Sequence, residues 1–484
     1  MNIFEKLAEE GYTAADPSFY NKIDEWHDWW AGDVKSFHYY TVFNGRKEIQ
    51  QKRKTLNMPQ QACADWADLL LNEKVKISCE EQSAQALLID VLDKNNFWVR
   101  GNECVENAFW SGLAAIVPYP DGIQVQKESG EILGAEKIRL SYMCGREIIP
   151  LTIHNNLCTE CAFLTDHTRE KKVYSFLRMF IKGKDGKYIC KNRLFENENG
   201  SIGEVNSICS VKGFENIADE WNTDSTEIPW VFIRPNKVNS ISPNSPFGMA
   251  VFSDAISVCE GIDIIYDAYV NEFALGKTRV AVSAQTLMQS EFNKNKGKLD
   301  RLEQPAFDAN DLVFYQLPGD PETPFIKEIQ PDIRAQQMQI GINDNLNLYS
   351  IKCGFGEKHF RFDGTSTAAT ATEVISQNSK MFRTLKKHEI VLEAALKHLC
   401  KLILLMGRDY LKKPLNPDAE IVIDFDDSII EDTQATLNDM RMDVASGILK
   451  PEYYLSKKYG VTEEEAKGMM PDFDREEEIG VENV

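Results

Sequence analysis

The chain has 484 residues, of which 43% are hydrophobic and 27% are charged, and its formal net charge is −21. The length allows about two to four structural units with a sizeable core. The acidic balance argues against a protein that reads DNA sequence, because such a protein needs a basic stripe for the phosphate backbone. The sequence shows no apolar run long enough to span a membrane and no secretory signal, and its eleven cysteines are scattered. We therefore expect no membrane contact and free thiols in a reducing compartment.

Aromatic helices are predicted near the start of the chain. Ile23, Trp26 and Trp30 are spaced as on one face of a helix. A second helix is expected from Met58, where Pro59 supplies a helix-start signal, and residues 81–99 have the apolar pattern of one further amphipathic helix. Packing helices are the simplest interpretation of these aromatic residues.

The central part of the chain is predicted to be mainly β-structure. Short alternating runs in residues 114–233 are separated by turn sequences such as Pro120-Asp-Gly122 and Lys184-Asp-Gly186. Together with the flanking helices, they predict an α+β fold.

A long helix is predicted over residues 249–275. Glu260, Asp263 and Asp267 follow a spacing of three and four, so they share one face of this helix. An ordinary solvated helix face is one interpretation of these acids.

The remaining chain predicts a small unit followed by two more helices. Residues 277–330 contain short strands, residues 331–352 have a helical pattern, and a glycine-containing loop occupies 353–367. A very long helix is expected over 371–411, and one strand over 419–425.

His154, Cys158 and Cys161 form the best metal-ligand candidate, with Cys144 upstream. A structural zinc site commonly uses two pairs of ligands, and only one pair is present here. No nucleophile elbow, phosphate-binding loop or metalloprotease motif occurs. We therefore expect no metal, no cofactor and no catalytic residues, and keep a zinc-dependent or head-assembly enzyme as the alternative.

Several segments together resemble one known family. In chain order they are residues 22–32, 56–58, 66–73, 245–256, 263–266, 271–273, 370–374 and 447–451. Their order resembles that of phage portal proteins, the head-to-tail connectors of siphophages that infect Gram-positive bacteria. The resemblance covers nearly the whole chain.

The resemblance implies an α+β portal fold with a mixed α/β wing, a two-helix stem, a small α/β clip and a helical crown. Its expected parts are the N-terminal wing (1–245), the first stem helix (246–276), the clip (277–330), the second stem helix (331–353), the tunnel loop (354–369), the long wing helix (370–411) and the last wing strand with the crown (412–484).

The resemblance also implies a function. Portal proteins form a homo-oligomeric ring, usually of about twelve subunits, around a central channel. Such a ring occupies one capsid vertex of the virion after assembly in the host cytoplasm. It conducts double-stranded DNA non-specifically during packaging and ejection. It also meets the terminase motor, scaffold and major capsid proteins, and a head-completion adaptor. A multimeric virion protein without a channel is a further alternative.

Two sets of residues become site candidates on this resemblance. Glu260, Asp263 and Asp267 are expected to face the channel, where like charge would keep DNA centred and mobile. Lys358, His359 and Arg361 give the expected tunnel loop a few cations for weak phosphate contacts. An ordinary exposed loop is the alternative for these three.

Overall fold

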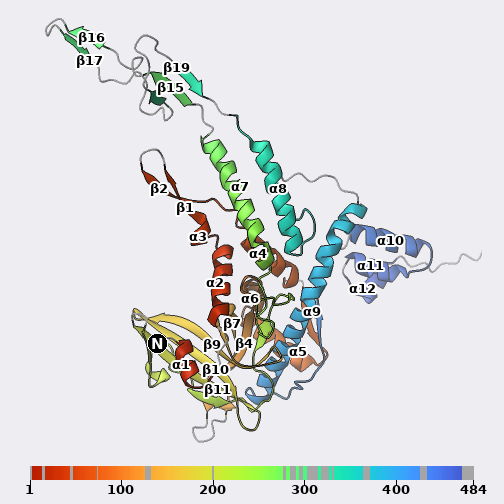
Figure 1. Cartoon of the computed structure of the whole chain (residues 1–484). Helices are drawn as coiled ribbons and strands as arrows, with labels where there is room; N and C mark the ends of the chain where they lie inside the picture. Colours follow the sequence, from red (N-terminus) through yellow and green to blue (C-terminus); the bar gives the residue numbers. More distant parts are fainter. Residues whose placement is uncertain are drawn as a thin grey trace, which may run out of the picture.

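A body of helices and sheets carries a pair of long helices that project from it and end in a small group of strands (Figure 1). The structure is a computed structural model. It describes residues 3–12, 17–43, 47–72, 75–125, 132–198, 201–275, 279–283, 290–293, 298–301, 314–317, 326–329, 332–362, 371–425, 433–459 and 461–470. The architecture is mixed α+β, as the sequence predicts.

The N-terminal part supplies short helices and a hairpin. These elements are α1 (Ile3–Glu9), α2 (Pro17–Trp30), α3 (Lys35–His38), β1 (Tyr39–Phe43), β2 (Glu48–Lys52), α4 (Met58–Leu70) and β3 (Lys76–Cys79). Ile23 and Trp26 of α2 are buried, which confirms the predicted packing face. Strands β1 and β2 pair antiparallel.

The prediction of a single helix over residues 81–99 is wrong, because the chain forms two helices in this region. These are α5 (Gln82–Lys94) and α6 (Phe97–Ser111). Asn96 takes a left-handed conformation with φ of 50°, which breaks the helix. The Asn95 side chain donates to the Ile138 carbonyl oxygen and accepts from the Leu140 backbone N–H, so tertiary hydrogen bonds stabilise the break.

Two sheets form the β-rich body, which confirms the prediction for residues 114–233. One has the strand order β14-β4-β7 and the other β12-β11-β10-β9-β8, with β13 paired to β11; β5 and β6 form a separate pair. Their bounds are β4 (Ala114–Asp121), β5 (Gln124–Val125), β6 (Ile132–Gly134), β7 (Lys137–Cys144), β8 (Ile148–His154), β9 (Leu157–Arg169), β10 (Lys172–Lys182), β11 (Tyr188–Glu198), β12 (Ser201–Glu204), β13 (Glu220–Asn222) and β14 (Val231–Ile233).

The helix predicted over residues 249–275 begins later than expected, because α7 spans Ile256–Leu275 after a short 3₁₀ turn at Ser253–Ala255. The preceding segment hydrogen-bonds to the end of α6 instead. The Gly248 and Val251 N–H groups donate to the carbonyl oxygens of Gly112 and Phe109. A Cβ atom on Gly112 would lie 2.7 Å from the Gly248 oxygen, so this contact needs glycine.

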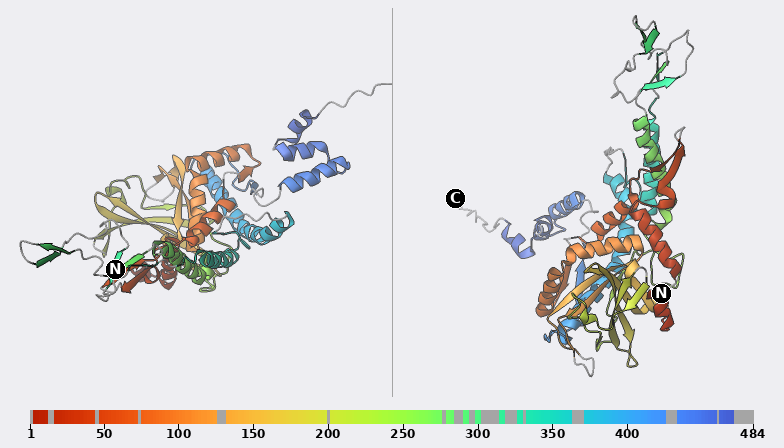
Figure 2. Two further views of the ribbon diagram at one scale, coloured as in Figure 1. Left: turned by 90° about the horizontal axis from the view of Figure 1, so that it is seen from above. Right: turned by 90° about the vertical axis from the view of Figure 1, so that its left-hand side faces the viewer.

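Helices α7 and α8 (Ala335–Lys352) pack side by side and form the projection. The chain runs outward along α7, through the strands at the tip, and back along α8 (Figures 1 and 2). The tip strands are β15 (Arg279–Ser283), β16 (Ser290–Asn293), β17 (Lys298–Arg301), β18 (Phe314–Leu317) and β19 (Ile326–Ile329). Strand β15 pairs with β18 and β19, and β16 pairs with β17.

The C-terminal part begins with α9 (Ala371–Asp409), which crosses the body and matches the very long helix predicted from the sequence. Strand β20 (Ile421–Asp424) then pairs antiparallel with β3, more than 300 residues earlier in the chain. Helices α10 (Thr433–Ala445), α11 (Pro451–Tyr459) and α12 (Glu463–Gly468) form a separate group that stands to one side of the body (Figure 2).

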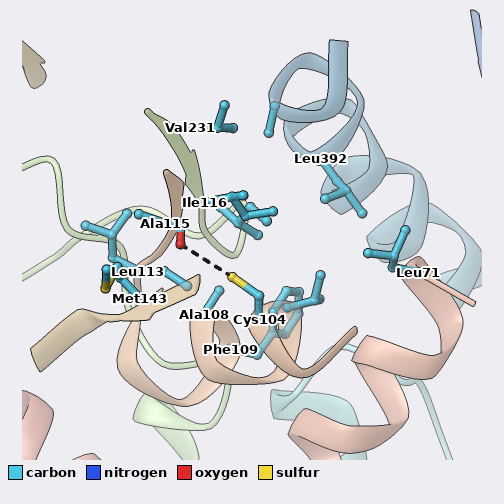
Figure 3. Close-up of a cluster of buried hydrophobic side chains, with 14 of the residues drawn as sticks. Leu71, Cys104, Ala108, Phe109, Leu113, Ala115, Ile116, Met143, Val231 and Leu392 are labelled. Carbon is cyan, nitrogen blue, oxygen red and sulfur yellow. Dashed lines mark hydrogen bonds between the residues drawn. The ribbon is translucent and has the colours of Figure 1, made fainter. Parts of the chain in front are cut away.

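The hydrophobic core joins α6, β4 and α9. Figure 3 shows Phe109 of α6, Ile116 of β4 and Leu392 of α9 turned toward one another. The Cys104 thiol donates to the Ala115 carbonyl oxygen at 3.8 Å inside this cluster. Burying each large apolar side chain contributes about 1.5–3 kcal/mol, so this cluster holds α9 against the sheet.

Candidate functional site

Two of the predicted acidic residues of α7 are buried beneath the N-terminal part of the chain. Asp263 is 4% exposed and Asp267 is 8% exposed. The Asp263 carboxylate accepts a hydrogen bond from the Leu56 backbone N–H at 3.0 Å. The Asp267 carboxylate accepts hydrogen bonds from the Lys54 backbone N–H and the Tyr40 hydroxyl, both at 3.0 Å. Both carboxylates therefore attach the segment 38–56 to α7.

The hydrogen bonds of His38 assign its tautomer. The Val34 backbone N–H donates to His38 Nδ1 at 2.8 Å, so this nitrogen is an acceptor. The proton of the neutral ring is then on Nε2, which lies 3.3 Å from an Asp263 oxygen and donates to it. Burial and the Asp267 carboxylate raise the pKa of the Tyr40 phenol, which keeps its hydroxyl protonated as a donor.

These contacts correct the expectation that Glu260, Asp263 and Asp267 form one exposed acidic face. The spacing does place them on one side of α7, but residues 38–56 cover two of the three. Glu260, one turn closer to the helix start, is partly exposed. It stays a candidate for a surface role.

The segment that follows α8 is attached to that helix through backbone hydrogen bonds. The N–H groups of residues 358, 360 and 362 donate to the side chains of Asn347, Ser350 and Asn343, at 2.7, 3.1 and 2.8 Å. These three polar residues are spaced by four and three along α8, so they share one face. The sequence prediction missed them, although this spacing was the available signal.

Aromatic stacking fixes the same segment on the core. The Phe355 ring is buried and lies between Trp66, at 4.5 Å between ring centroids, and His359, at 4.4 Å. His359 Nε2 is also 3.2 Å from an Asp65 carboxylate oxygen. The Trp66 indole N–H donates to the Cys353 carbonyl oxygen at 3.0 Å. The first part of the expected tunnel loop is therefore packed against α4.

The three predicted cations of this segment have different environments. All three residues are exposed, but the His359 ring is also stacked on Phe355 and paired with Asp65. Lys358 adopts a left-handed conformation with φ of 58°. Residues 363–370, which include most of the second half of the expected loop, lie outside the described residues.

The candidate zinc ligands do not form a metal site in the described part of the chain. Cys158 and Cys161 are buried, and their thiols donate to the carbonyl oxygens of Glu160 and Ala162. His154 is exposed at the end of β8. Within the described residues, no group of three or more histidine, cysteine and acidic side chains could hold a metal ion. The alternative of a zinc-dependent enzyme at these residues is not supported.

The projecting helices expose apolar side chains. Ile264 of α7 and Ile340 and Leu348 of α8 are about half exposed or more, at 49%, 62% and 51%. Two packed helices bury one face each, so such residues on the outer faces are free to contact another molecule. None of the helices in the described ranges is both long and apolar enough to cross a lipid bilayer.

Comparison with known proteins gives the family. A search of curated proteins found no match. The family model described as phage portal protein, SPP1 Gp6-like, matches residues 10–478, which is nearly the whole chain. The match covers the body, the projecting α7–α8 pair, the tip strands and the C-terminal helices described above. The chain therefore belongs to the SPP1 Gp6-like family of phage portal proteins.

Proposed function

We propose that this chain assembles into a closed ring around a central channel at one vertex of a phage capsid. The observation that carries the proposal is the family match over residues 10–478. The ring acts as a structural conduit, not as an enzyme. It forms in the host cytoplasm and becomes part of the virion, and double-stranded DNA passes through it during packaging and ejection.

The apolar surface of the projecting helices supports ring assembly. Ile264, Ile340 and Leu348 are exposed in the single chain, and a neighbouring copy in a ring would bury them. Closed rotational symmetry is the usual way for identical subunits to satisfy such surfaces, and portal rings commonly hold about twelve subunits.

The DNA path is proposed to pass the segment after α8. Lys358 and Arg361 are exposed there and are repeated in every subunit of a ring. Cations at this position would make weak phosphate contacts that do not depend on base sequence. Glu260 of α7 is proposed to repel the duplex, which would limit adhesion to the channel wall.

For the remaining parts of the chain, we infer the binding partners from the portal protein family. We assign the clip (277–330) to contacts with the terminase motor and later with the head-completion adaptor. The two wing segments (1–245 and 370–411) and the C-terminal wing strand and crown (412–484) are assigned to the capsid side, where the scaffold and major capsid proteins assemble around the ring. The stem helices (246–276 and 331–353) would join these two ends.

Imaging the purified chain by negative-stain electron microscopy tests the ring. We expect annular particles with a central hole for the wild type. Leu348→Asp should reduce ring formation at least tenfold, because it places a charge in the proposed contact between copies. Ile89→Asp is the matched control: Ile89 lies on α5 in the body, is 50% exposed against 51% for Leu348, and should leave rings intact. Monomers alone at every salt concentration would contradict the proposal.

A packaging assay with procapsids and the cognate terminase tests the DNA path. Lys358→Glu combined with Arg361→Glu should lower the amount of packaged DNA at unchanged ring assembly, because the phosphate contacts become repulsive. Lys171→Glu combined with Lys212→Glu changes the same net charge on exposed residues of the body and serves as the control. If both double variants package the same amount of DNA, the segment after α8 does not contact the DNA during packaging.

A further inference from the structure

An open cavity of about 840 Å³ lies in the β-rich body, away from the projecting helices. Tyr119 of β4, Arg139 of β7, Arg178 of β10 and the segment 213–218 are among its walls. Residues of both sheets thus face each other across it. None of the candidate residues of α7 or of the segment after α8 contributes to this lining.

Arg178 is a buried cation on the wall of this cavity. It is 8% exposed, and its Nε donates to the Asn192 side-chain oxygen at 3.1 Å. Its guanidinium lies 4.2 Å from the Tyr119 ring centroid and 5.5 Å from that of Phe176. Among the described residues, no carboxylate pairs with it and no acceptor binds its two terminal nitrogens. These nitrogens are the donors that remain available to a ligand in the cavity.

Arg178 has no carboxylate partner among the described residues and faces the open cavity. Its neighbours along the same face of β10 are Phe176 and Phe180, both buried, so the arginine interrupts an apolar face. An anion that enters the cavity would form charge-assisted hydrogen bonds with this guanidinium. Arg193, on the adjacent strand, shows the usual arrangement: its guanidinium is paired with Glu10 and Glu204, each at 2.7 Å.

The charge around the cavity favours an anion. Five basic residues line it against two acidic ones, in a chain whose net charge is −21. The basic residues are Lys94, Arg100, Arg139, Arg169 and Arg178, and the acidic ones are Asp121 and Glu215. Lys94 and Arg100 are already paired, with Asp90 and Glu103. Arg139 is likewise paired with Asp121, so the excess charge comes mainly from Arg169 and Arg178.

We propose that this cavity binds a small phosphate-bearing ligand of nucleotide size, with Arg178 as its anchor. Cavities of about 300–1,000 Å³ are typical of small-molecule sites. The guanidinium presents a planar pair of donors that matches two phosphate oxygens, and stacking on Tyr119 fixes its plane. None of Glu260, Lys358 and Arg361 lines the cavity, so the site is distinct from the proposed DNA path.

Isothermal titration calorimetry of the full chain with pyrophosphate and with ATP, at constant ionic strength, tests the site. We expect saturable binding of at least one of the two by the wild type. Arg178→Met should weaken it at least tenfold because the guanidinium donors are lost, and circular dichroism should show that the variant is folded. Arg193→Met is the matched control on the opposite face of the same sheet, and it should bind as the wild type does.

Arg178→Lys keeps the charge but loses the planar pair of donors, so we expect about tenfold weaker binding. This variant decides the question if Arg178→Met does not fold. No saturable binding of either probe by the wild type would overturn the proposal, and so would equal binding by all the Arg178 variants. Ring formation that is independent of phosphate and is lost in Arg178→Met would also overturn it, because an acidic side chain of a second copy would then be the occupant.

Discussion

His38 and Asp263 meet in the interior of the molecule, where the imidazole Nε2 donates to a carboxylate oxygen at 3.3 Å. The second oxygen of the same carboxylate accepts from the Leu56 backbone N–H. One side chain of α7 thus satisfies one buried and one partly buried donor from a part of the chain that lies more than 200 residues earlier.

Asp263→Ala should lower the free energy of unfolding by about 2–5 kcal/mol, because it leaves one buried and one partly buried donor without an acceptor. Asp263→Asn keeps one acceptor oxygen and should cost about half as much. Glu260→Ala, at a partly exposed position of the same helix, should change stability by no more than about 0.5 kcal/mol. Urea unfolding followed by circular dichroism measures all three, and equal effects of Asp263→Ala and Glu260→Ala would contradict the role of the buried carboxylate.

Acid should destabilise the fold through His388. Burial, followed by the nearby Lys387 and Lys237 charges, lowers the pKa of this imidazole from 6.5 to about 3. Its Nδ1 accepts from the Asn236 backbone N–H at 3.0 Å, which also favours the neutral ring. The unfolded chain then binds one more proton between these two pH values. The free energy of unfolding should therefore fall by about 1.4 kcal/mol per pH unit from this residue as the pH drops from 6 to 4.

Unfolding curves of the wild type and His388→Gln at several pH values measure this contribution. The glutamine can still accept a hydrogen bond but does not titrate, so the pH dependence should become shallower by that amount. His154→Gln, which removes an exposed imidazole, controls for the loss of one histidine. A slope that His388→Gln leaves unchanged would contradict the assignment.

Gly354→Ala should destabilise the junction between α8 and the following segment by about 2 kcal/mol or more, since strain and a clash add. Gly354 has φ of 92°, and a Cβ there would lie 2.7 Å from Thr384 Cγ2 of α9. Thr384→Ser removes that methyl group and should recover part of the loss in the double variant. Gly186→Ala, with φ of 81° and open space around it, should show the backbone strain alone, about 1 kcal/mol. Thermal unfolding of Gly354→Ala, Thr384→Ser, the double variant and Gly186→Ala measures these effects. Equal losses of stability in Gly354→Ala and Gly186→Ala would show that the contact with Thr384 adds no cost.

Asn347→Ala should release the start of the segment after α8. The Lys358 N–H would lose its acceptor, so its hydrogen exchange should accelerate by about tenfold, which corresponds to about 1.4 kcal/mol. Asn345→Ala is the control, because among the described residues the Asn345 amide donates to the Gly341 carbonyl oxygen of the same helix. Exchange at Lys358 that responds equally to both substitutions would mean that Asn347 does not hold the segment.

The long helices were the most predictable part of the fold. Helical periodicity predicts residues 371–411, and α9 occupies Ala371–Asp409. For the helix predicted over residues 249–275, only the end at Leu275 matches. Its start was not predictable, because residues 248–251 hydrogen-bond to the end of α6, and that pairing depends on the tertiary fold.

The start of helix α6 could not be predicted from the amphipathic pattern of the sequence. Residues 81–99 carry a continuous amphipathic pattern, but Asn96 turns the chain with a positive φ and a new helix begins at Phe97. Asparagine tolerates this conformation without requiring it, so the sequence alone does not locate the turn. The hydrogen bonds of Asn95 to β7 decide it.

The candidate site was predictable in position but not in environment. The spacing of Asp263 and Asp267 correctly places them on one face of α7. Whether such a face is exposed depends on what covers it, and here the cover comes from residues 38–56. Likewise, the short spacing of Cys158 and Cys161 suggests ligands, but both thiols point into the core. Periodicity identifies faces, whereas burial depends on distant segments.

The attachment of residues 38–56 to α7 has a mechanical consequence. Asp263 and Asp267, one turn apart, each bind a backbone N–H of this segment, so helix and segment are joined at two points. A joint with two points resists rotation about either one. If α7 tilts relative to the body, the β1–β2 hairpin should therefore move together with it as one rigid unit.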